Sequence, residues 1–264
     1  MVYIQLNEEK TQMRSLKLTD RITDWIREKV KEADAEGVVV GMSGGLDSSV
    51  TVVLCKKAFP DTTLGLILPC FSLKEDVEHA RVVANAFEIE TKEIDLSNIF
   101  KSVLNTLEAR GYGIEDKKSE MNIPVANLKP RLRMICLYYF ANKLNYLVVG
   151  TGNKSELSVG YFTKYGDGAA DILPLGDLLK TEERKLAEEL DISEAIIDKV
   201  PSAGLWEGQT DESELGMSYD VLDKTLLAIE SGDFSGCDPE SVKKVKRMIE
   251  ASRHKRENIA VFKK

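Results

Sequence analysis

The stretch VVVGMSGGLDSSVTVVLC, residues 38–55, constrains the fold more than any other part of the sequence. The apolar run Val38–Val40 predicts a buried strand, and Val50 and Leu54 lie at helical spacing. Between them lies the segment Ser43–Ser49, which contains two glycines, three serines and one aspartate. Glycines let a backbone approach a ligand closely, and a helix start offers free N–H groups and the positive end of its dipole. The junction therefore predicts an anion-binding turn between a strand and a helix.

Further apolar runs alternate with helical patterns along the chain. Strands are predicted at 38–42, 64–69, 89–94 and 146–150, and helices at 8–33, 48–58, 75–87, 98–110 and 125–143. This alternation is typical of an α/β fold with a Rossmann-like, doubly wound parallel sheet and helices on both faces. Ligands of such sheets bind beyond the carboxyl ends of the strands. We therefore expect the polar segments 42–48 and 150–156 to face one crevice.

After residue 150 the pattern changes to a polar, glycine-rich stretch, 150–171, followed by a helical C-terminal part. The spacing predicts helices near 180–190, 193–199, 218–230 and 239–254, and a polar loop over 202–217. Because the sequence shows no internal repeat or low-complexity linker, we expect a single domain over residues 1–264.

Composition excludes several classes of protein. Apolar residues make up 43% of the 264 residues, which is enough for a sizeable core. The net charge of −8 argues against a nucleic-acid partner, because such partners need a basic face. We see no signal peptide and no apolar run of membrane-spanning length, so we expect a cytoplasmic protein with no membrane partner. The four cysteines lack C-x-x-C spacing, which favours buried apolar cysteines over a zinc site.

The segment Ser43–Ser49 resembles a P-loop, but no lysine precedes its serine pair as in a Walker A sequence. Its S-G-G-x-D-S order instead resembles the pyrophosphatase loop of enzymes that split ATP between the α and β phosphates and adenylate a substrate. Backbone N–H groups and serine hydroxyls would cradle the pyrophosphate. A bare carboxylate would repel phosphate unless a cation lay between them, so Asp47 is a candidate Mg²⁺ ligand. The alternative is an Asp or Ser that caps the helix in a tight turn.

Later segments narrow the resemblance to one family. Four phrases are similar to those of ammonia-dependent NAD synthetases: NLKPRLRM (127–134), GTGNKSELSVGYFTKYGDGAADILPLGDLLKTEER (150–184), PSAGLWEGQTDESELGMSYDVLD (201–223) and HKR (254–256). The resemblance runs from about residue 38 to the end of the chain, in the same order.

The resemblance implies a ligase that adenylates deamido-NAD (nicotinic acid adenine dinucleotide) with ATP and amidates it with ammonia. The products would be NAD, AMP and pyrophosphate, in the last step of NAD biosynthesis. It also implies Mg²⁺ as cofactor, ATP as co-substrate and a homodimer. A chain of 264 residues leaves no room for an added glutaminase domain, so free ammonia or a separate partner would supply the nitrogen.

The resemblance also implies a task for individual residues. ATP would contact Gly41, Met42, Ser43, Gly44, Gly45, Leu46, Asp47, Ser48, Thr151, Lys180 and Ser202. Deamido-NAD would contact Arg131, Lys164, Asp171, His254 and Lys255. Asp47 and Glu156 would share Mg²⁺, while Asp47, Lys180 and Asp171 would take part in catalysis. Asp171 is a candidate for binding or deprotonating ammonium, and the segments 160–171 and 204–217 are candidate lids.

Several assignments have simpler structural alternatives. Thr151 and Glu156 also fit a capping box at the start of a helix. Lys164 and Lys180 would be surface lysines were it not for the phrases around them, and the basic run at the C-terminus fits a solvated helix face. The chain departs from the family pattern at Leu46 (often Gln), Pro130 (a small residue), Ser202 (Thr) and Gly204 (Asp).

Other functions fit the sequence less well. A tRNA-thiolating enzyme would need catalytic cysteines and a basic RNA surface, and the phrase GYFTKYGDGAAD argues against a guanylate-forming amidotransferase subunit. A sensor that only binds ATP is an alternative of another class. The presence of Asp47, Glu156 and Lys180 together favours turnover, and pyrophosphate release that depends on deamido-NAD would separate the two.

Overall fold

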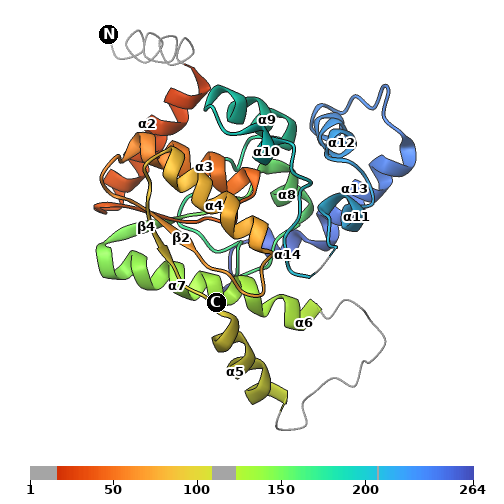
Figure 1. Cartoon of the computed structure of the whole chain (residues 1–264). Coiled ribbons are helices and arrows are strands. Elements are labelled where there is room, and N and C mark those ends of the chain that lie inside the picture. Colours follow the sequence, from red (N-terminus) through yellow and green to blue (C-terminus); the bar gives the residue numbers. More distant parts are fainter. Residues whose placement is uncertain (1–16, 109–122, 207) are drawn as a thin grey trace.

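A parallel sheet forms the centre of the computed structural model, which describes residues 17–108, 123–206 and 208–264 (Figure 1). Its four strands lie in the order β3-β2-β1-β4. They are β1 (Gly37–Gly41), β2 (Thr63–Ile67), β3 (Glu90–Glu93) and β4 (Tyr146–Val149). The four predicted strands and their parallel arrangement are therefore confirmed.

The strand order changes direction between β1 and β4. The chain moves outward from β1 through β2 to β3, and β4 then returns to the other edge of β1, so that Val38 lies between Thr63 and Leu147. A ligand crevice opens at such a point, beyond the carboxyl ends of the two strands. Asn153, which follows β4, is hydrogen-bonded there to Asp47, which follows β1. This contact confirms that the two polar segments meet.

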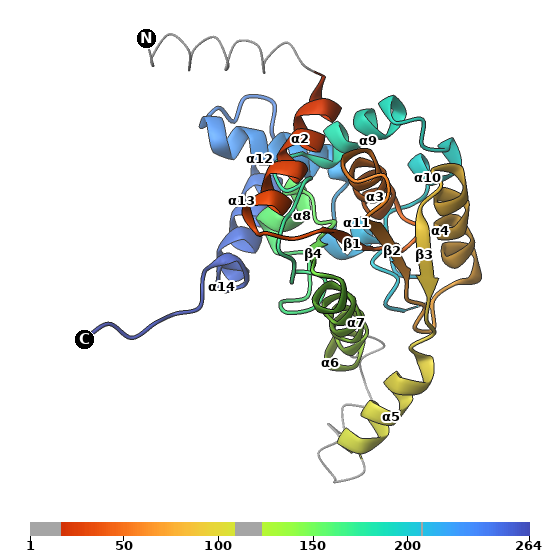
Figure 2. The ribbon, with the colours of Figure 1, turned by 90° about the vertical axis from the view of Figure 1, so that its left-hand side faces the viewer.

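Helices cover both faces of the sheet (Figures 1 and 2). One face carries α2 (Leu18–Glu32), α3 (Leu46–Ala58) and α4 (Lys74–Ala86), and the other carries α5 (Ser97–Leu107), α6 (Ile123–Ala126) and α7 (Leu128–Leu144). Val38 and Val40 enter the first core, whereas Val39 enters the second. Because successive strand residues point to opposite faces, an unbroken apolar run is what a strand covered on both sides needs.

The C-terminal part is helical, as predicted. It contains α8 (Lys154–Val159), α9 (Lys180–Glu189), α10 (Glu194–Ile197), α11 (Asp211–Leu215), α12 (Tyr219–Ser231), α13 (Pro239–Ala251) and α14 (Arg253–Arg256). A third core between α8, α11, α12 and α13 includes Val159, Leu215, Leu222 and Val245. The short helices α8 and α11 lie in stretches that we expected to be irregular.

Some expectations are only partly met. Residues 8–16 of the predicted first helix lie outside the described residues, and α2 begins at Leu18. Cys55 and Cys70 are buried as expected, whereas Cys136 and Cys237 are half-buried. In the part of the chain that the structure describes, no helix has the length and apolarity needed to span a bilayer. The single domain over residues 1–264 stays a prediction.

Candidate active site

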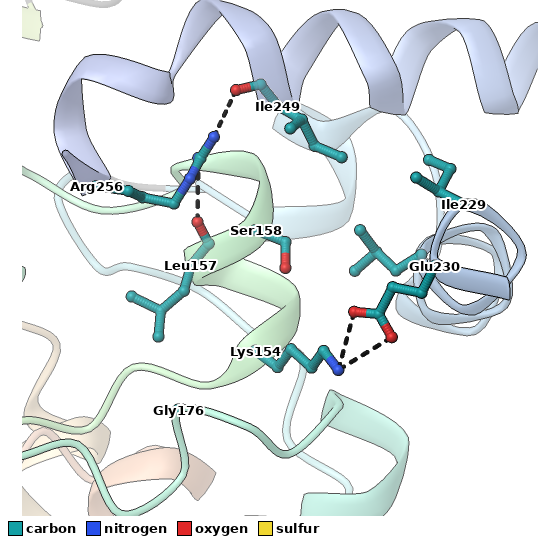
Figure 3. Close-up of a pocket in the computed structure, with 9 residues that line it drawn as sticks. Lys154, Leu157, Ser158, Gly176, Ile229, Glu230, Ile249 and Arg256 are labelled. Carbon is teal, nitrogen blue, oxygen red and sulfur yellow. Dashed lines mark hydrogen bonds and ion pairs between the residues drawn. The ribbon is translucent and has the colours of Figure 1, made fainter.

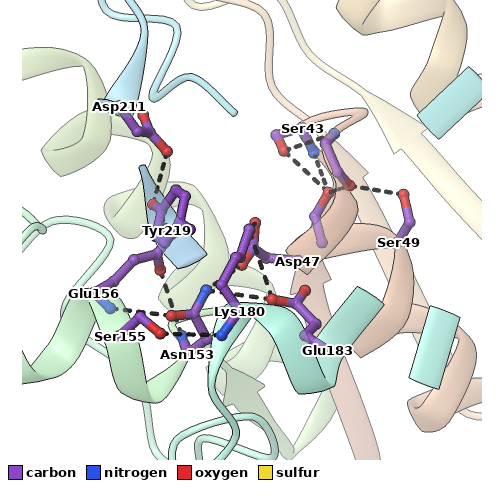
Figure 4. A network of polar contacts seen from close by, with 12 residues as sticks. Ser43, Asp47, Ser49, Asn153, Ser155, Glu156, Lys180, Glu183, Asp211 and Tyr219 are labelled. Carbon is purple, nitrogen blue, oxygen red and sulfur yellow. Dashed lines mark hydrogen bonds and ion pairs between the residues drawn. The ribbon is translucent and has the colours of Figure 1, made fainter. Parts of the chain in front are cut away.

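The glycine loop (residues 42–45), between β1 and α3, is folded by its own polar groups (Figure 4). Ser43 Oγ lies 3.0 Å from Ser48 Oγ, and the Gly45 N–H donates to Ser43 Oγ at 3.2 Å. Gly44 has a φ of +78°, and a Cβ at this position would lie 2.0 Å from the backbone oxygen of Asp76. Glycine is therefore required where α4 closes over the loop.

Helix α3 begins directly after the loop with Gly45 as its N-cap, and among the described residues no side chain caps it. The alternative in which an Asp or Ser caps this helix is therefore wrong. Ser48 and Ser49 instead donate their hydroxyl groups to the Gly45 carbonyl, at 3.1 and 2.8 Å. The N–H groups of the first turn, at the positive end of the helix dipole, are left for an anionic ligand.

A network of buried and half-buried polar side chains (the buried network: Asp47, Asn153, Glu156, Lys180 and Glu183) lies beside the glycine loop (Figure 4). Lys180 Nζ is 2.6 Å from Asp47 Oδ2 and 3.5 Å from Glu183 Oε2. Asn153 Nδ2 donates to Asp47 Oδ1 at 2.7 Å and to Glu183 Oε2 at 3.3 Å. The surface-lysine alternative for Lys180 is wrong, because this side chain is only 1% exposed.

Glu156 joins the network through a capping box. Asn153 caps α8 by accepting from the Glu156 N–H at 3.0 Å, and the Asn153 N–H donates back to Glu156 Oε2 at 3.4 Å. The capping-box alternative for Glu156 is therefore confirmed, with Asn153 rather than Thr151 as the cap. The other oxygen of Glu156, Oε1, lies 3.4 Å from the Tyr219 hydroxyl. The capping box thus holds Glu156 near Asp47 through Oε2, while Oε1 makes only the long contact with Tyr219 and could bind a ligand.

Carboxyl groups outnumber ammonium groups in the buried network. Burial alone would raise the pKa of Asp47, but the charge of the Lys180 ammonium and the hydrogen bonds that Asp47 accepts together outweigh it and hold this pKa below its usual range. Burial and the charge of Asp47 raise the pKa values of Glu156 and Glu183 well above the usual range. Burial would lower the pKa of Lys180, but Asp47 and Glu183 raise it overall. One ammonium therefore faces three carboxyl groups, and further positive charge would be stabilised here.

The donor set fits Mg²⁺. Among the described residues, Glu183 Oε1 is buried without a hydrogen-bond partner, which marks an unmet demand for positive charge or a donor. No group of three His, Cys, Asp or Glu side chains in the described ranges forms a complete metal cage. Mg²⁺ commonly takes one or two carboxylates and completes its shell with water and substrate phosphates. Asp47 and Glu156 match that arrangement.

Four of the five residues predicted to bind the dinucleotide come together between α7, the segment after α8 and α14. Arg131 Nη2 donates to the Lys164 carbonyl at 3.4 Å, and Lys164 Nζ donates to the His254 carbonyl. Lys255 Nζ donates to the Gly160 carbonyl at 2.7 Å. This grouping was not evident from their spacing in sequence, which spans more than a hundred residues. Their binding role stays a prediction.

Asp171 lies instead at the edge of β4. Its Oδ2 accepts from the Val148 N–H at 2.7 Å, and its Oδ1 accepts from the Tyr138 hydroxyl at 3.2 Å. Both oxygens thus help to hold the strand edge, and each keeps a second lone pair that could accept a hydrogen bond from ammonium. Its role in substrate binding and catalysis stays a prediction.

The remaining predicted ATP contacts follow the strand ends. Gly41 ends β1, Met42 is buried after it, and Thr151 is half-buried after β4. Ser202 Oγ accepts from the Gly204 N–H at 3.1 Å, in a turn where Gly204 has a φ of +61°. A positive φ favours glycine over aspartate, which gives a conformational reason for the departure at this position.

Sequence reasoning missed four members of the site: Asn153, Glu183, Asp211 and Tyr219. The pattern Asn153-x-x-Glu156 could have revealed the cap, and Glu183 lies one helical turn from Lys180. The Tyr219 hydroxyl donates to Asp211 Oδ2 at 3.0 Å. No local pattern predicts this last contact, because it depends on how α11 and α12 pack against α8.

A pocket on the other side of α8 brings together none of the predicted site residues (Figure 3). Apolar side chains of Leu157, Ile229 and Ile249 line it. Its charged side chains are engaged, since Lys154 Nζ lies 2.9 Å from Glu230 Oε1 and Arg256 donates to backbone carbonyls. The candidate active site is therefore the glycine loop together with the buried network.

Comparisons with known proteins agree with this site. A family model described as NAD synthase matches residues 18–259. An NH3-dependent NAD(+) synthetase from Carboxydothermus hydrogenoformans is 48% identical over 238 residues, which cover 90% of this chain and 93% of that protein.

Solved structures agree as well. The structure of an NMN synthetase from Francisella tularensis has a TM-score of 0.82 at 33% identity and covers 92% of this chain and 96% of that chain. The NH3-dependent NAD synthetase from Campylobacter jejuni, in complex with the nitrate ion, has a TM-score of 0.78 at 30% identity and covers 93% and 98%. Since the family model spans nearly all described residues, the chain belongs to the NAD synthase family.

Proposed function

We propose that this protein is an ammonia-dependent ligase that adenylates deamido-NAD with ATP and amidates it, forming NAD, AMP and pyrophosphate. This is the last step of NAD biosynthesis. The observation that carries the proposal is the contact of Lys180 with Asp47 beside the glycine loop, at the point where the strand order reverses. An anion-binding turn, a fixed ammonium and surplus carboxylates are what an ATP phosphate site with a metal needs.

In the first step, a carboxylate oxygen of the substrate attacks the α-phosphorus of ATP. The bond from the α-phosphorus to the oxygen that bridges the α and β phosphates breaks, and pyrophosphate leaves with that oxygen. Negative charge builds up on the phosphoryl oxygens and on the leaving group. The N–H groups at the start of α3 and the ammonium of Lys180 stabilise that charge, and both are in place before ATP binds.

Mg²⁺ is part of this proposal, with Asp47 and Glu156 as its protein ligands. When bound, it would neutralise triphosphate charge and polarise the phosphoryl group under attack. Asp47 stands in the first turn of α3 and Glu156 in the first turn of α8, and Asn153 contacts both. This support orients the two carboxylates from opposite sides of the crevice.

In the second step, ammonia attacks the acyl carbon of the adenylate, and AMP leaves with the electrons of the broken C–O bond. Ammonium has no free electron pair, so one proton must be lost before the attack, and the attacking nitrogen loses a second proton as the neutral amide forms. Asp171 is the candidate base, and it would use a lone pair that its bonds to Tyr138 and Val148 leave open. The segments 160–171 and 204–217 would exclude water from the adenylate, which would otherwise be hydrolysed.

The likeness to an NMN synthetase makes a mononucleotide the second candidate substrate. Adenylation and amidation would then act on nicotinic acid mononucleotide at the same glycine loop. The curated relative named as an NAD(+) synthetase is the more similar in sequence, 48% against 33% identical, and we therefore favour the dinucleotide.

One assay tests both candidates. The purified protein is mixed with ATP, Mg²⁺, ammonium and either deamido-NAD or the mononucleotide acid. We expect NAD, AMP and pyrophosphate in equal amounts, with a higher kcat/KM for deamido-NAD. Formation of ADP instead of AMP would contradict cleavage between the α and β phosphates, and a higher kcat/KM for the mononucleotide would reverse the choice of substrate.

The proposal includes a homodimer in the cytoplasm. Exposed apolar side chains on α7, among them Ile135 and Tyr139, give a surface that a second copy could cover. Sedimentation velocity at micromolar concentration should show twice the chain mass of 29.4 kDa.

Cell fractionation in the source organism would test the cytoplasmic location.

A further inference from the structure

Lys199 contacts the glycine loop from the side of α4 and has no role in the assignments above. It follows α10, and its Nζ donates to Asp76 Oδ1 at 2.6 Å and to the Gly44 carbonyl at 3.2 Å. His79 Nδ1 lies 3.3 Å from the same ammonium and accepts from it when that ring nitrogen carries no proton. A single ammonium therefore joins the glycine loop to the first two turns of α4.

The contact fixes the peptide between Gly44 and Gly45. A trans peptide is planar, so holding the Gly44 carbonyl also fixes the direction of the Gly45 N–H. That N–H lies 3.2 Å from Ser43 Oγ and belongs to the turn that starts α3. Gly44, with a φ of +78°, has no side chain to restrict this peptide, so its orientation depends on the hydrogen bonds at its two ends, from the Gly45 N–H to Ser43 Oγ and from Lys199 Nζ to the Gly44 carbonyl.

Lys199 is held in place by partners of its own. The side chains of Lys199 and Asp76 are only 23% and 18% exposed, so their ion pair is screened less than a surface pair. Because the ammonium is already paired, it acts through the loop rather than as a free cation for phosphate. Ser202, a predicted phosphate contact, lies three residues further along the chain, and the same anchor therefore restricts this segment too.

We propose that Lys199, held by Asp76 and His79, is a positioning residue for ATP. It keeps the Gly44–Gly45 peptide in the orientation from which α3 begins, so that the N–H groups of the first turn of α3 face the nucleotide phosphates. The inference rests on the proposed function, because it takes the glycine loop as the ATP site. Loss of Lys199 would then weaken ATP binding selectively, whereas loss of a purely structural ion pair would lower stability and leave the KM for ATP unchanged.

Lys199→Met tests this directly, because it removes the ammonium and keeps an unbranched side chain. We expect the KM for ATP to rise about tenfold and the KM for deamido-NAD to change less than about twofold. The Kd of α,β-methylene ATP, measured by calorimetry, should rise by a similar factor. Lys185→Met, at an exposed position of α9, is the matched control and should leave all three values unchanged.

Asp76→Asn is the second variant and decides the outcome if Lys199→Met does not fold. Asparagine keeps an acceptor for the ammonium but loses the charge, so the KM for ATP should rise in the same direction and by less. Unchanged KM for ATP in both folded variants, with wild-type protein that makes NAD, would overturn the inference and leave the proposed function standing. If the wild-type protein makes no NAD, the proposed function is wrong. The role of Lys199 is then tested by binding alone, and an unchanged Kd of α,β-methylene ATP in the variants would show that Lys199 does not position the ATP site.

Discussion

The ammonium of Lys180 lies 2.6 Å from Asp47 Oδ2, although 133 residues separate the two in sequence. Lys180 opens α9, and Asp47 stands in the first turn of α3. A charge that is removed from water is stable only when it is paired, so each side chain fixes the position of the other. The pair thereby joins the glycine loop to the C-terminal half of the chain and sets a cation beside the expected place of the triphosphate.

Asp47→Asn keeps the shape of the side chain and removes its charge. If Asp47 is a ligand of Mg²⁺, we expect kcat/KM for NAD formation to fall roughly 100-fold or more. Pyrophosphate release measures the effect, and circular dichroism shows that the fold is retained. Asp61→Asn, at an exposed position between α3 and β2, is the control. Near-normal turnover of Asp47→Asn would contradict the metal assignment.

Lys180→Met should slow the first half-reaction most, because the ammonium stabilises charge on the leaving pyrophosphate. It should also lower the free energy of unfolding by about 3 kcal/mol, since the fully buried Glu183 and the half-buried Asp47 would lose their cation. Rapid-quench measurement separates pyrophosphate release from NAD formation. A defect confined to the ammonia step would show that Lys180 has another role.

Local patterns predicted the sheet well. The apolar run Val38–Val40 has to be a buried strand, and paired glycines before Asp47 and Ser48 leave few alternatives to a turn at a helix start. Both features depend on residues that are neighbours in sequence. The short helix α11 was missed and α8 was predicted only as an alternative, because each has only one or two turns, too few for a hydrophobic period to be visible.

The site was only partly predictable for a related reason. In the sequence KTEERK, nothing distinguishes Glu183 from the charged residues around it. Its complete burial follows from how α9 packs against α3. Lys199 meets Gly44 and Asp76 across long stretches of chain. Contacts of this kind depend on tertiary packing, and a single sequence carries no period or spacing that reports them.

The contact between Tyr138 and Asp171 should make the folded state less stable as the pH rises into the alkaline range. Burial raises the pKa of Tyr138 to about 12 from the ordinary value of 10, and the Asp171 carboxylate adds to the rise. The folded state therefore holds this proton more tightly. The resulting stability is present in full below pH 10 and is lost as the pH rises toward 12.

Tyr138→Phe should lack this alkaline loss, which urea unfolding between pH 9 and about 12 would measure. Asp171→Asn should lower the pKa of Tyr138, as read from phenolate absorbance. Tyr139→Phe, at the exposed neighbouring position, should keep the wild-type pH dependence. An identical pH profile for wild type and Tyr138→Phe would rule out the coupling.

Lys255→Met tests the predicted dinucleotide site. Lys255 Nζ donates to the carbonyls of Gly160 and Phe162, at 2.7 and 2.8 Å, and so shapes the segment that leads to Lys164. We expect the KM for deamido-NAD to rise about tenfold while the KM for ATP changes little. Lys263→Met, near the exposed end of the chain, is the control. An equal rise of both KM values would point to a general loss of structure instead.

Gly160 and Gly232 both end a helix with a positive φ, but only Gly160 is closely packed, so comparing their alanine variants separates the cost of backbone strain from the cost of an overlap. Gly160 ends α8 with a φ of +70°, and Gly232 ends α12 with a φ of +76°. A Cβ at Gly160 would lie 2.2 Å from Ser252 Cβ, whereas within the described residues nothing lies within 4 Å of a Cβ at Gly232. Both alanine variants therefore share the cost of a positive φ, and Gly160→Ala alone adds an overlap.

Chemical denaturation should show a loss of about 1 kcal/mol for Gly232→Ala, from the positive φ alone. Gly160→Ala should lose roughly 3 kcal/mol, since either α8 or the start of α14 must move to relieve the overlap. Such a shift would carry Lys255 with it, because Lys255 Nζ is bonded to the Gly160 carbonyl. The KM for deamido-NAD should therefore rise in Gly160→Ala and stay unchanged in Gly232→Ala. Equal losses of stability with equal KM values would mean that the contact of Gly160 with Ser252 places no constraint on the dinucleotide site.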